Sequence, residues 1–190
     1  MKILKKIFDL TMDSLETVIF IGSLYIVVYI YLFMPTSVIG SSMEPTLKNK
    51  DRLIVNKVYY KFKSLERGDI IVIKSPKNPD IDYVKRLIGL PNDTILIKDG
   101  KAYINNVQLP QDFISGQTNT WLGGFLQEDQ SFKIPDNYVF VMGDNRERSS
   151  DSREFGPIPL SSIVGQVPFR YYPPDKFGTL ENPLPLNLRH

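Results

Sequence analysis

The side chains that this chain offers for chemistry are of few kinds. It contains no cysteine, and its one histidine, His190, is the last residue of the sequence. Thiol nucleophiles and thiolate metal sites are therefore excluded. A frayed terminus is a poor place for the imidazole of a catalytic triad or of a zinc site. Hydrolytic chemistry must then use hydroxyls, carboxylates, lysines or tyrosines, and the sequence predicts neither a metal ion nor another cofactor.

Four short segments place such side chains among turn residues. They are Gly40–Leu47, which holds Ser42; Gly68–Val72; Asp82–Pro91, which holds Lys85; and Gly143–Arg153. Taken one at a time, each has an ordinary structural interpretation: a serine in a turn, a turn before an apolar strand, a solvated lysine in a strand, and a polar loop. No single segment predicts an activity.

Taken together and in this order, the four segments resemble the sequence boxes of type I signal peptidases, the membrane-bound serine proteases that remove signal peptides from exported proteins. The matches are S-M-x-P-T-L at Ser42–Leu47, G-D-x-x-V at Gly68–Val72, Y-V-K-R-x-x-G-L-P at Tyr83–Pro91 and G-D-N-R-x-x-S-x-D-S-R at Gly143–Arg153. With the apolar segment that precedes them, they cover the chain from about Leu15 to Pro159. Four motifs in register behind a membrane anchor make the resemblance specific.

The resemblance implies a role for each matched residue. Ser42 corresponds to the nucleophile and Lys85 to its general base, and Ser149 corresponds to the serine that hydrogen-bonds this lysine. Asp151 and Arg153 correspond to a structural ion pair beside the site, and Asp144 belongs to the same supporting loop.

The resemblance also implies where the substrate binds. Pro35–Gly40 and Tyr83–Val84 match the walls that hold the substrate as an added strand, with small side chains preferred at the first and third residues before the cut. We expect the substrate to contact Val38, Gly40, Met43, Tyr83 and Val84. Many relatives have a serine, where this chain has Gly40, that helps to bind the oxyanion. The oxyanion is therefore expected to depend on backbone N–H groups, that of Ser42 foremost.

A serine–lysine pair makes physical sense only if the lysine is neutral. A serine hydroxyl is inert until a base takes its proton, and a free lysine, with a pKa of ~10.4, is almost wholly charged at pH 7. Burial among apolar side chains disfavours the charged amine and lowers its pKa. The predicted dry surroundings of Lys85 are Met43, Val84, Leu87 and Ile88.

The N-terminal part of the chain predicts a single membrane anchor. Thr17–Met34 is an uncharged run of 18 residues, which spans roughly 27 Å as a helix, close to the hydrocarbon core of a bilayer. A cleavable signal peptide is disfavoured because the run is long and no A-x-A-like site follows it. We expect residues 1–14, with three lysines, in the cytoplasm, residues 15–34 in the plasma membrane, and the remainder on the extracytoplasmic side.

From Pro35 onward the pattern predicts a mainly β fold. Short apolar runs separated by turn residues indicate an antiparallel sheet, in agreement with the coiled antiparallel β-sheet that the resemblance implies. The predicted catalytic domain is 35–179, followed by a flexible tail, 180–190. We expect Asp112–Ser131 to be a surface excursion, in which Trp121–Leu126 packs against the domain's own sheet or dips into the bilayer. The expected strands are Ser37–Ile39, Arg52–Asn56, Ile70–Lys74, Asp82–Ile88, Thr94–Lys98, Tyr103–Ile104, Tyr138–Met142 and Ile163–Tyr171.

Other functions fit the sequence less well. A net charge of +2, without a basic cluster, gives no support to nucleic-acid binding. Self-cleaving repressors share the serine–lysine pair but have no membrane anchor, and the S-x-x-K motif of penicillin-binding proteins is absent. An inactive, membrane-anchored β-domain that binds partners remains the alternative. The expected partners are the lipid bilayer and the signal peptides of exported preproteins, and the sequence predicts no oligomeric state.

Overall fold

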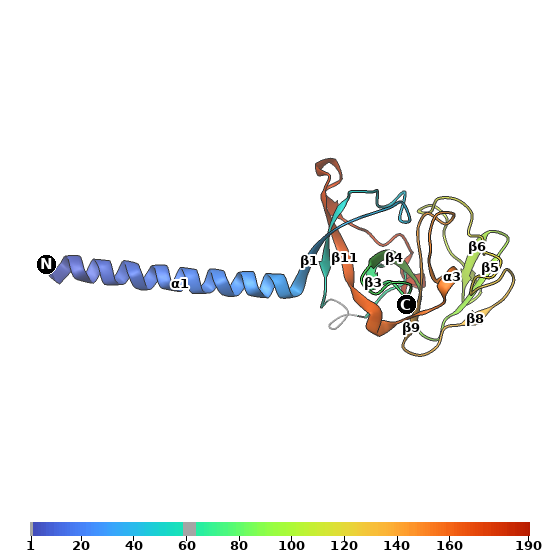
Figure 1. Ribbon diagram of the computed structural model, residues 1–190, viewed down its shortest axis with the longest axis horizontal. Helices are drawn as coiled ribbons and strands as arrows, with labels where there is room; N and C mark the ends of the chain where they lie inside the picture. The colour runs from blue at the N-terminus through green and yellow to red at the C-terminus, as the bar shows by residue number, and fades with distance from the viewer. Residues whose placement is uncertain (1, 59–63) are drawn as a thin grey trace. The chain divides into compact units, whose positions relative to one another are not determined.

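The computed structural model describes residues 2–58 and 64–190 (Figure 1). Met1, which begins the predicted cytoplasmic segment, and residues 59–63, inside the predicted catalytic domain, lie outside the described residues. The chain forms two compact units, the first ending at Met34 and the second running from Pro35 to His190. Each is described by itself below.

The first unit is one long helix, α1, Lys2–Leu32. Its apolar side chains are exposed all round, and it is long and apolar enough to cross a membrane. The helix ends shortly before Pro35, because the residue before a proline disfavours the helical conformation. Phe33 and Met34, which we expected in the anchor, begin strand β1, Phe33–Ser37, instead. Among the described residues α1 is the single helix of this kind, as expected of a single-pass protein.

The second unit contains two antiparallel sheets. The larger has the order β1-β2-β11-β3-β4-β9-β10, with β12 beside β11, and the smaller has the order β7-β6-β5-β8. Their strands are β2 Arg52–Asn56, β3 Ile70–Lys74, β4 Asp82–Gly89, β5 Thr94–Lys98, β6 Lys101–Ile104, β7 Val107–Gln108, β8 Phe132–Lys133, β9 Tyr138–Met142, β10 Ile158–Pro159, β11 Ile163–Tyr172 and β12 Gly178–Thr179. The short helices are α3 Ser152–Phe155, η1 Leu160–Ser162, η2 Pro174–Lys176 and α4 Leu186–Arg189. The mainly β, antiparallel fold is therefore confirmed.

Strands β4 and β9 are buried on both faces, because a separate apolar cluster covers each face. Successive side chains of a strand point to opposite faces. Leu87 of β4 accordingly packs in the cluster with Val139 and Val141, and Ile88 packs in the other cluster with Phe140. Polar side chains in the second half of β4, those of Lys85 and Arg86, are therefore buried although they emerge on opposite faces.

Most of the predicted strands are found with the predicted bounds or with one or two residues more. The turn Asp99–Gly100 joins β5 to β6, and both of its residues have the positive φ that such a two-residue hairpin requires. The prediction of a strand at Ser37–Ile39 is wrong, since β1 ends at Ser37. Beyond that point Val38 exchanges backbone hydrogen bonds with the Lys50–Asp51 turn instead. The sequence analysis missed the short strands β7, β8, β10 and β12.

The segment Asp112–Ser131 is only in part a surface excursion. Thr118 and Leu126 are buried, whereas Leu122 is fully exposed. The ring of Trp121 lies against the guanidinium of Arg153, with 4.5 Å from the centroid to Cζ. Trp121 and Leu126 thus pack against their own unit, in agreement with the first of the two interpretations of this stretch.

The last residues were expected to form a flexible tail, but they are held by contacts with the domain. Leu184 belongs to the core, and Leu188 packs against it. Asn182 donates from its side-chain amide to the carbonyl of Arg67 (2.8 Å), and Arg67 donates to the carbonyl of Leu188 (3.1 Å). The proline content that predicted mobility instead permits a bent path across the core.

Candidate active site

A cleft of about 560 Å³ lies between two chain segments of the second unit. One wall is Thr36–Met43, which follows from β1, and the other is Ile81–Lys85, at the start of β4. Arg148 and Ser150 line it as well. The cleft contains Ser42 and Lys85, and all the residues expected to bind substrate line it: Val38, Gly40, Met43, Tyr83 and Val84.

The turn that carries Ser42 is anchored on both sides. Met43 and Leu47 are buried, and the N–H of Leu47 donates to the carbonyl of Met43 (2.8 Å). The carbonyl of Ser42 accepts a hydrogen bond of 3.0 Å from the N–H of Asn145. Within the part of the chain that the structure describes, no backbone hydrogen bond uses the N–H of Ser42. This amide is therefore available to an oxyanion.

Gly143 lets the serine turn and the polar loop approach each other. A Cβ on Gly143 would clash with the Ser42 carbonyl oxygen and with Oγ of Ser149. Only a residue without a side chain fits between these two, which explains the glycine that begins the fourth motif. Ser42 and Ser149, 107 positions apart in the sequence, are thereby brought to either side of one backbone position.

Lys85 is a buried amine with a polar partner. Its exposed fraction is 3%, and Nζ donates to Oγ of Ser149 at 3.1 Å. The amine also lies 5.4 Å from the ring centroid of Tyr83. Burial lowers the pKa of Lys85 to about 8; Asp151 opposes the shift, and Arg153 adds to it. At pH 7 about a tenth of this amine is consequently neutral, compared with well under about 0.1% of an ordinary lysine, and the neutral form is the one that a base requires.

The dry surroundings of Lys85 differ in part from those predicted. Ile71 lies directly opposite Lys85 on β3, and Leu87 shares its face of β4. Ile88, which we expected there, emerges on the other face and belongs to the other core cluster. The error arose because proximity in sequence was used where the alternation along a strand decides the neighbours.

Asp151 and Arg153 form a fully buried ion pair beside the lysine. Arg153 donates through Nε and Nη2 to the two carboxylate oxygens, both at 2.9 Å. Asp151 also accepts from the N–H of Gly143 (3.0 Å) and is the N-cap of α3. Burial raises the pKa of Asp151, but the hydrogen bonds and charge of Arg153 outweigh it, so its pKa is lowered and it stays ionised. The pair therefore holds the loop around Gly143 in one conformation.

A second buried ion pair joins all four motif segments. Arg86 donates through Nε and Nη2 to the two oxygens of Asp144, at 2.7 and 2.6 Å. Arg86 also donates to the carbonyl of Gly68 (2.6 Å), and the hydroxyl of Thr46 donates to Asp144 (2.6 Å). The sequence analysis named Asp144 but not Arg86 or Thr46. Both residues lie inside the motifs, which was the available signal. For Arg86 there was a second signal, because the residue next to Lys85 on a strand must point to the opposite face.

Arg146 is a third buried guanidinium, and it has no carboxylate partner among the described residues. It donates from Nε to the carbonyl of Gly143 (3.1 Å) and from Nη1 to the hydroxyl of Thr118 (2.6 Å). Burial lowers the pKa of Arg146 to about 10, with Arg153 adding to the shift. The sequence analysis missed both residues of this contact. Nothing local marks Thr118, because its partner lies 28 residues away.

One edge of β4 is free beside Lys85. β4 pairs with β3 from Asp82 to Arg86, but its registered pairs with β9 begin only at Arg86. Among the described strands, none pairs with the other edge of Asp82–Lys85. An extended peptide in the cleft therefore meets unsatisfied backbone groups on this edge, which is the geometry of strand addition.

Comparisons with known proteins agree with the resemblance found in the sequence. The profile of the family described as "Signal peptidase, peptidase S26" matches residues 11–172. Signal peptidase IB of Staphylococcus aureus (strain COL) is 37% identical over 185 residues, which cover 90% of this chain and 96% of that protein.

Two further similarities cover a smaller share of one of the two proteins compared. Thylakoidal processing peptidase 1, chloroplastic, of Arabidopsis thaliana is 36% identical over 152 residues; these are 75% of this chain but 43% of that protein, so the chain spans less than half of it. A crystal structure of a signal peptidase I from Enterococcus faecalis V583 is 34% identical and covers 55% of this chain and 97% of that one, with a TM-score of 0.45.

Proposed function

The chain belongs to the signal peptidase family, peptidase S26, and from this membership we propose how it acts as a serine endopeptidase on signal peptides: Ser42 is the nucleophile and neutral Lys85 is the general base. The observation that supports this most directly is a buried amine, with a pKa of about 8, that lines the same cleft as Ser42. The lone histidine is 148 residues from Ser42 in the sequence and does not line that cleft.

The reaction follows from these two groups. Lys85 takes the proton of the Ser42 hydroxyl as the oxygen attacks the scissile carbonyl, and the N–H of Ser42 binds the oxyanion. The ammonium then protonates the leaving amine, which frees the mature protein. Neutral Lys85 next takes a proton from water, and the hydroxide attacks the acyl–Ser42 ester. The ammonium returns the proton to Oγ of Ser42 as the ester bond breaks, which releases the signal peptide with a free carboxylate and restores both groups.

Ser149 positions the base during both steps. Its hydroxyl accepts a hydrogen bond from Lys85 without adding a charge, so it orients the amine and leaves its pKa to the dry surroundings. Asp144, Asp151 and Arg153 hold the loop that carries Ser149, and none of them contacts the reacting atoms in this scheme.

The substrate is the signal peptide of an exported preprotein, bound as an extended strand along the free edge of Asp82–Val84. Val38 and Val84 limit the size of the side chains at the first and third residues before the cut. Gly40, Met43 and Tyr83 complete the contact surface, and Gly40 leaves room for the substrate backbone because it has no Cβ.

The apolar part of α1, up to Leu32, serves as the membrane anchor. We assign residues 1–14 to the cytoplasmic side and the domain that begins at Pro35 to the extracytoplasmic side of the plasma membrane. In this orientation the catalytic domain meets preproteins after their translocation. Protease added to intact spheroplasts is expected to digest the domain, with a cytoplasmic protein as the protected control; digestion only after permeabilisation contradicts this topology.

The direct test of the activity uses the full-length protein in detergent micelles and a purified preprotein. Wild-type protein is expected to release the mature protein, and Ser42→Ala is expected to reduce the rate by at least about 10³-fold while the protein stays folded. Ser41→Ala is the matched control, since it removes a neighbouring hydroxyl that has no role in the scheme. Undiminished cleavage by Ser42→Ala, with contaminating peptidase excluded, contradicts the assignment.

A further inference from the structure

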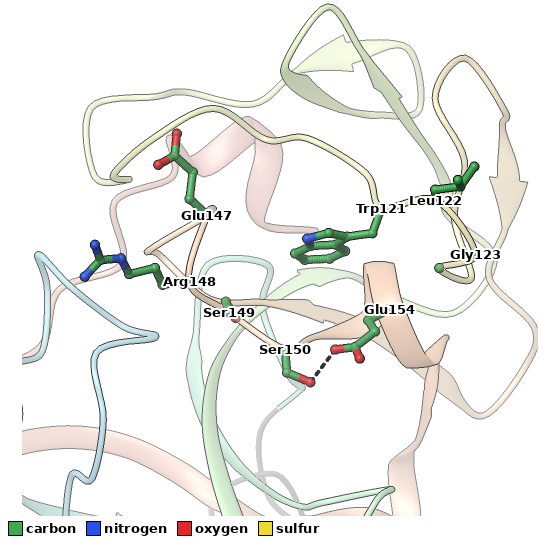
Figure 2. Close-up of a pocket in the computed structure, with 9 residues that line it drawn as sticks. Trp121, Leu122, Gly123, Glu147, Arg148, Ser149, Ser150 and Glu154 are labelled. Carbon is green, nitrogen blue, oxygen red and sulfur yellow. Dashed lines mark hydrogen bonds between the residues drawn. The ribbon is translucent and has the colours of Figure 1, made fainter.

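A hollow separate from the cleft lies on the other side of the loop Glu147–Ser150. Its volume is about 440 Å³, and it opens between Trp121–Gly124 and the loop Glu147–Ser150 (Figure 2). Arg148 and Ser150 line both the hollow and the catalytic cleft, so the two adjoin at these residues. Ser149, which binds Lys85, also lines the hollow. The hollow is thus next to the reacting groups but outside the site described above.

In the proposed function, on which this step rests, the substrate chain runs from the cleft toward this hollow. If the residues before the cut lie along Thr36–Gly40 and Asp82–Val84, the scissile bond lies at Ser42 and Lys85. The residues after the cut then continue beyond that end of the two walls. Apart from Val72 of β3, which lies opposite Val84, Arg148 and Ser150 are the cleft residues that belong to neither wall. An extended chain advances ~3.3 Å per residue, so the first few residues of the mature protein reach them.

The charged side chains where the hollow adjoins the cleft favour a negative charge on the substrate. Glu154 is paired with Lys77 (2.6 Å) and accepts from Ser150 (2.6 Å), as Figure 2 shows for the serine. The carboxylate of Glu147 lies over Gly116. Arg148 is exposed, and it makes no ion pair with any residue of the described ranges. Figure 2 shows its side chain extending away from Trp121. Arg148 is therefore the unpaired cation at the wall that the two cavities share, whereas Glu147, which has no ion pair among the described residues either, lines the hollow but not the cleft.

The hollow itself offers a firm apolar surface. Trp121 is held from one side by the guanidinium of Arg153, at 4.5 Å. Leu122, beside it, lines the hollow and is fully exposed. Its side chain is thus free to contact a bound peptide or to be replaced without disturbing the core.

We infer that this hollow binds the first residues of the mature protein, and that Arg148 favours an acidic side chain at the first or second residue after the cut. A guanidinium binds a carboxylate through charge-assisted, often bidentate hydrogen bonds. Because the pair is partly exposed to water, the preference is modest, about two- to fivefold in kcat/KM for Asp over Lys.

The test measures kcat/KM for peptides that share one signal sequence and carry Asp, Asn, Ala or Lys at the first or second residue after the cut. Wild-type protein is expected to prefer Asp, Arg148→Gln to lose the preference, and Arg148→Glu to prefer Lys. Leu122→Lys and Leu122→Glu place a charge in the hollow alone, and are expected to raise and lower the preference for Asp. Lys133→Glu makes the same charge change as Arg148→Glu on the second sheet, and is expected to leave the preference unchanged.

Two failures are distinguishable in this experiment. If Ser42→Ala cleaves the peptides as fast as wild-type protein, the proposed function is wrong. If Ser42→Ala is inactive, and the Asp-to-Lys ratio is the same in wild-type protein, Arg148→Glu and both Leu122 variants, the proposed function stands and the inferred subsite is wrong.

Discussion

Arg86 and Asp144 form a buried, bidentate ion pair that lies on the opposite face of β4 from Lys85. Gly68 and Thr46 complete its hydrogen bonds, so the four motif segments meet at one point. The guanidinium also packs against the ring of Phe113, 4.9 Å from its centroid. The motifs therefore share a structural centre that is distinct from Ser42 and Lys85, the proposed reacting groups. The motifs that carry the sequence resemblance contain both the residues of this ion-pair centre and the Ser42–Lys85 pair.

The first prediction concerns this pair. Asp144→Asn leaves the buried charge of Arg86 without its counter-charge, and is expected to lower the free energy of unfolding by about 3–5 kcal/mol. Urea unfolding followed by circular dichroism measures the change. Asp129→Asn is the matched control, because Asp129 pairs with Lys98 in an exposed position at 3.4 Å and the loss is expected to stay below about 1 kcal/mol. Equal effects of the two substitutions contradict the prediction.

The second prediction concerns Thr118 and Arg146. Thr118→Val has nearly the same shape but removes the acceptor from a buried guanidinium, which is expected to lower stability by about 1–3 kcal/mol. It is also expected to reduce kcat, because Arg146 contacts Gly143 and accepts from Arg153 through its carbonyl. Thr118→Ser keeps the hydroxyl and is expected to restore both quantities. A valine variant that matches wild type in both shows that the contact is dispensable.

The features that were predicted correctly and those that were missed differ in how local their sequence signals are. The strands were predictable because alternating apolar residues and turn residues are local signals, as at Asp99–Gly100. Lys85 and Ser149 were predictable through the motif resemblance, although 64 residues separate them. Thr118 was not, because its importance lies entirely in a contact formed by the tertiary fold. The tail was misjudged for the same reason: its composition indicated mobility, whereas the burial of Leu184 depends on a distant core.

The third prediction concerns the choice of cleavage site. Val38 is 6% exposed and Val84 is half-buried opposite Val72, and all three line the cleft. Val38→Ala and Val84→Ala enlarge the pockets, so they are expected to raise kcat/KM by about fivefold or more for peptides with Leu in place of Ala at the first or third residue before the cut. Val107→Ala, on β7 of the second sheet, is the control. Unchanged selectivity in both cleft variants removes these residues from the pockets.

The fourth prediction concerns the free energy of unfolding, which the burial of Lys85 lowers at neutral pH. The folded-state pKa of about 8 lies below the ordinary 10.5, so between these values the unfolded chain binds more protons than the folded one. The free energy of unfolding therefore rises with pH through this window. At ~1.4 kcal/mol per pKa unit, the difference amounts to about 3 kcal/mol. Lys85→Met is thus expected to be more stable than wild type at pH 7 and about equal to it near pH 10.5.

Lys133→Met is the control for that comparison, because Lys133 is exposed and its replacement is expected to leave the pH dependence of wild type intact. Unfolding by urea at pH 7, 8, 9 and 10 measures the effect. A stability difference between Lys85→Met and wild type that is the same at every pH shows that the amine keeps an ordinary pKa in the folded protein.

The last prediction concerns the pH dependence of catalysis. Because the base must be neutral, kcat/KM is expected to rise with pH, with an apparent pKa of about 8, and to level off above it. Two units below that pKa the rate is expected to be about 100-fold lower than on the plateau. Lys85→Arg keeps the positive charge but cannot deprotonate, so it is expected to be as inactive as Ser42→Ala at every pH. Lys74→Arg, an exposed lysine paired with Asp82, is expected to retain activity.

The arginine variant decides between two roles for the lysine, a base or a fixed charge beside Ser149. Stability measured on the same sample separates inactivity from misfolding, since a folded but inactive Lys85→Arg protein excludes collapse of the buried site as the cause. Substantial turnover by Lys85→Arg, with the pH profile of wild type preserved, means that Lys85 supplies only charge. The proton of Ser42 must then leave by another route.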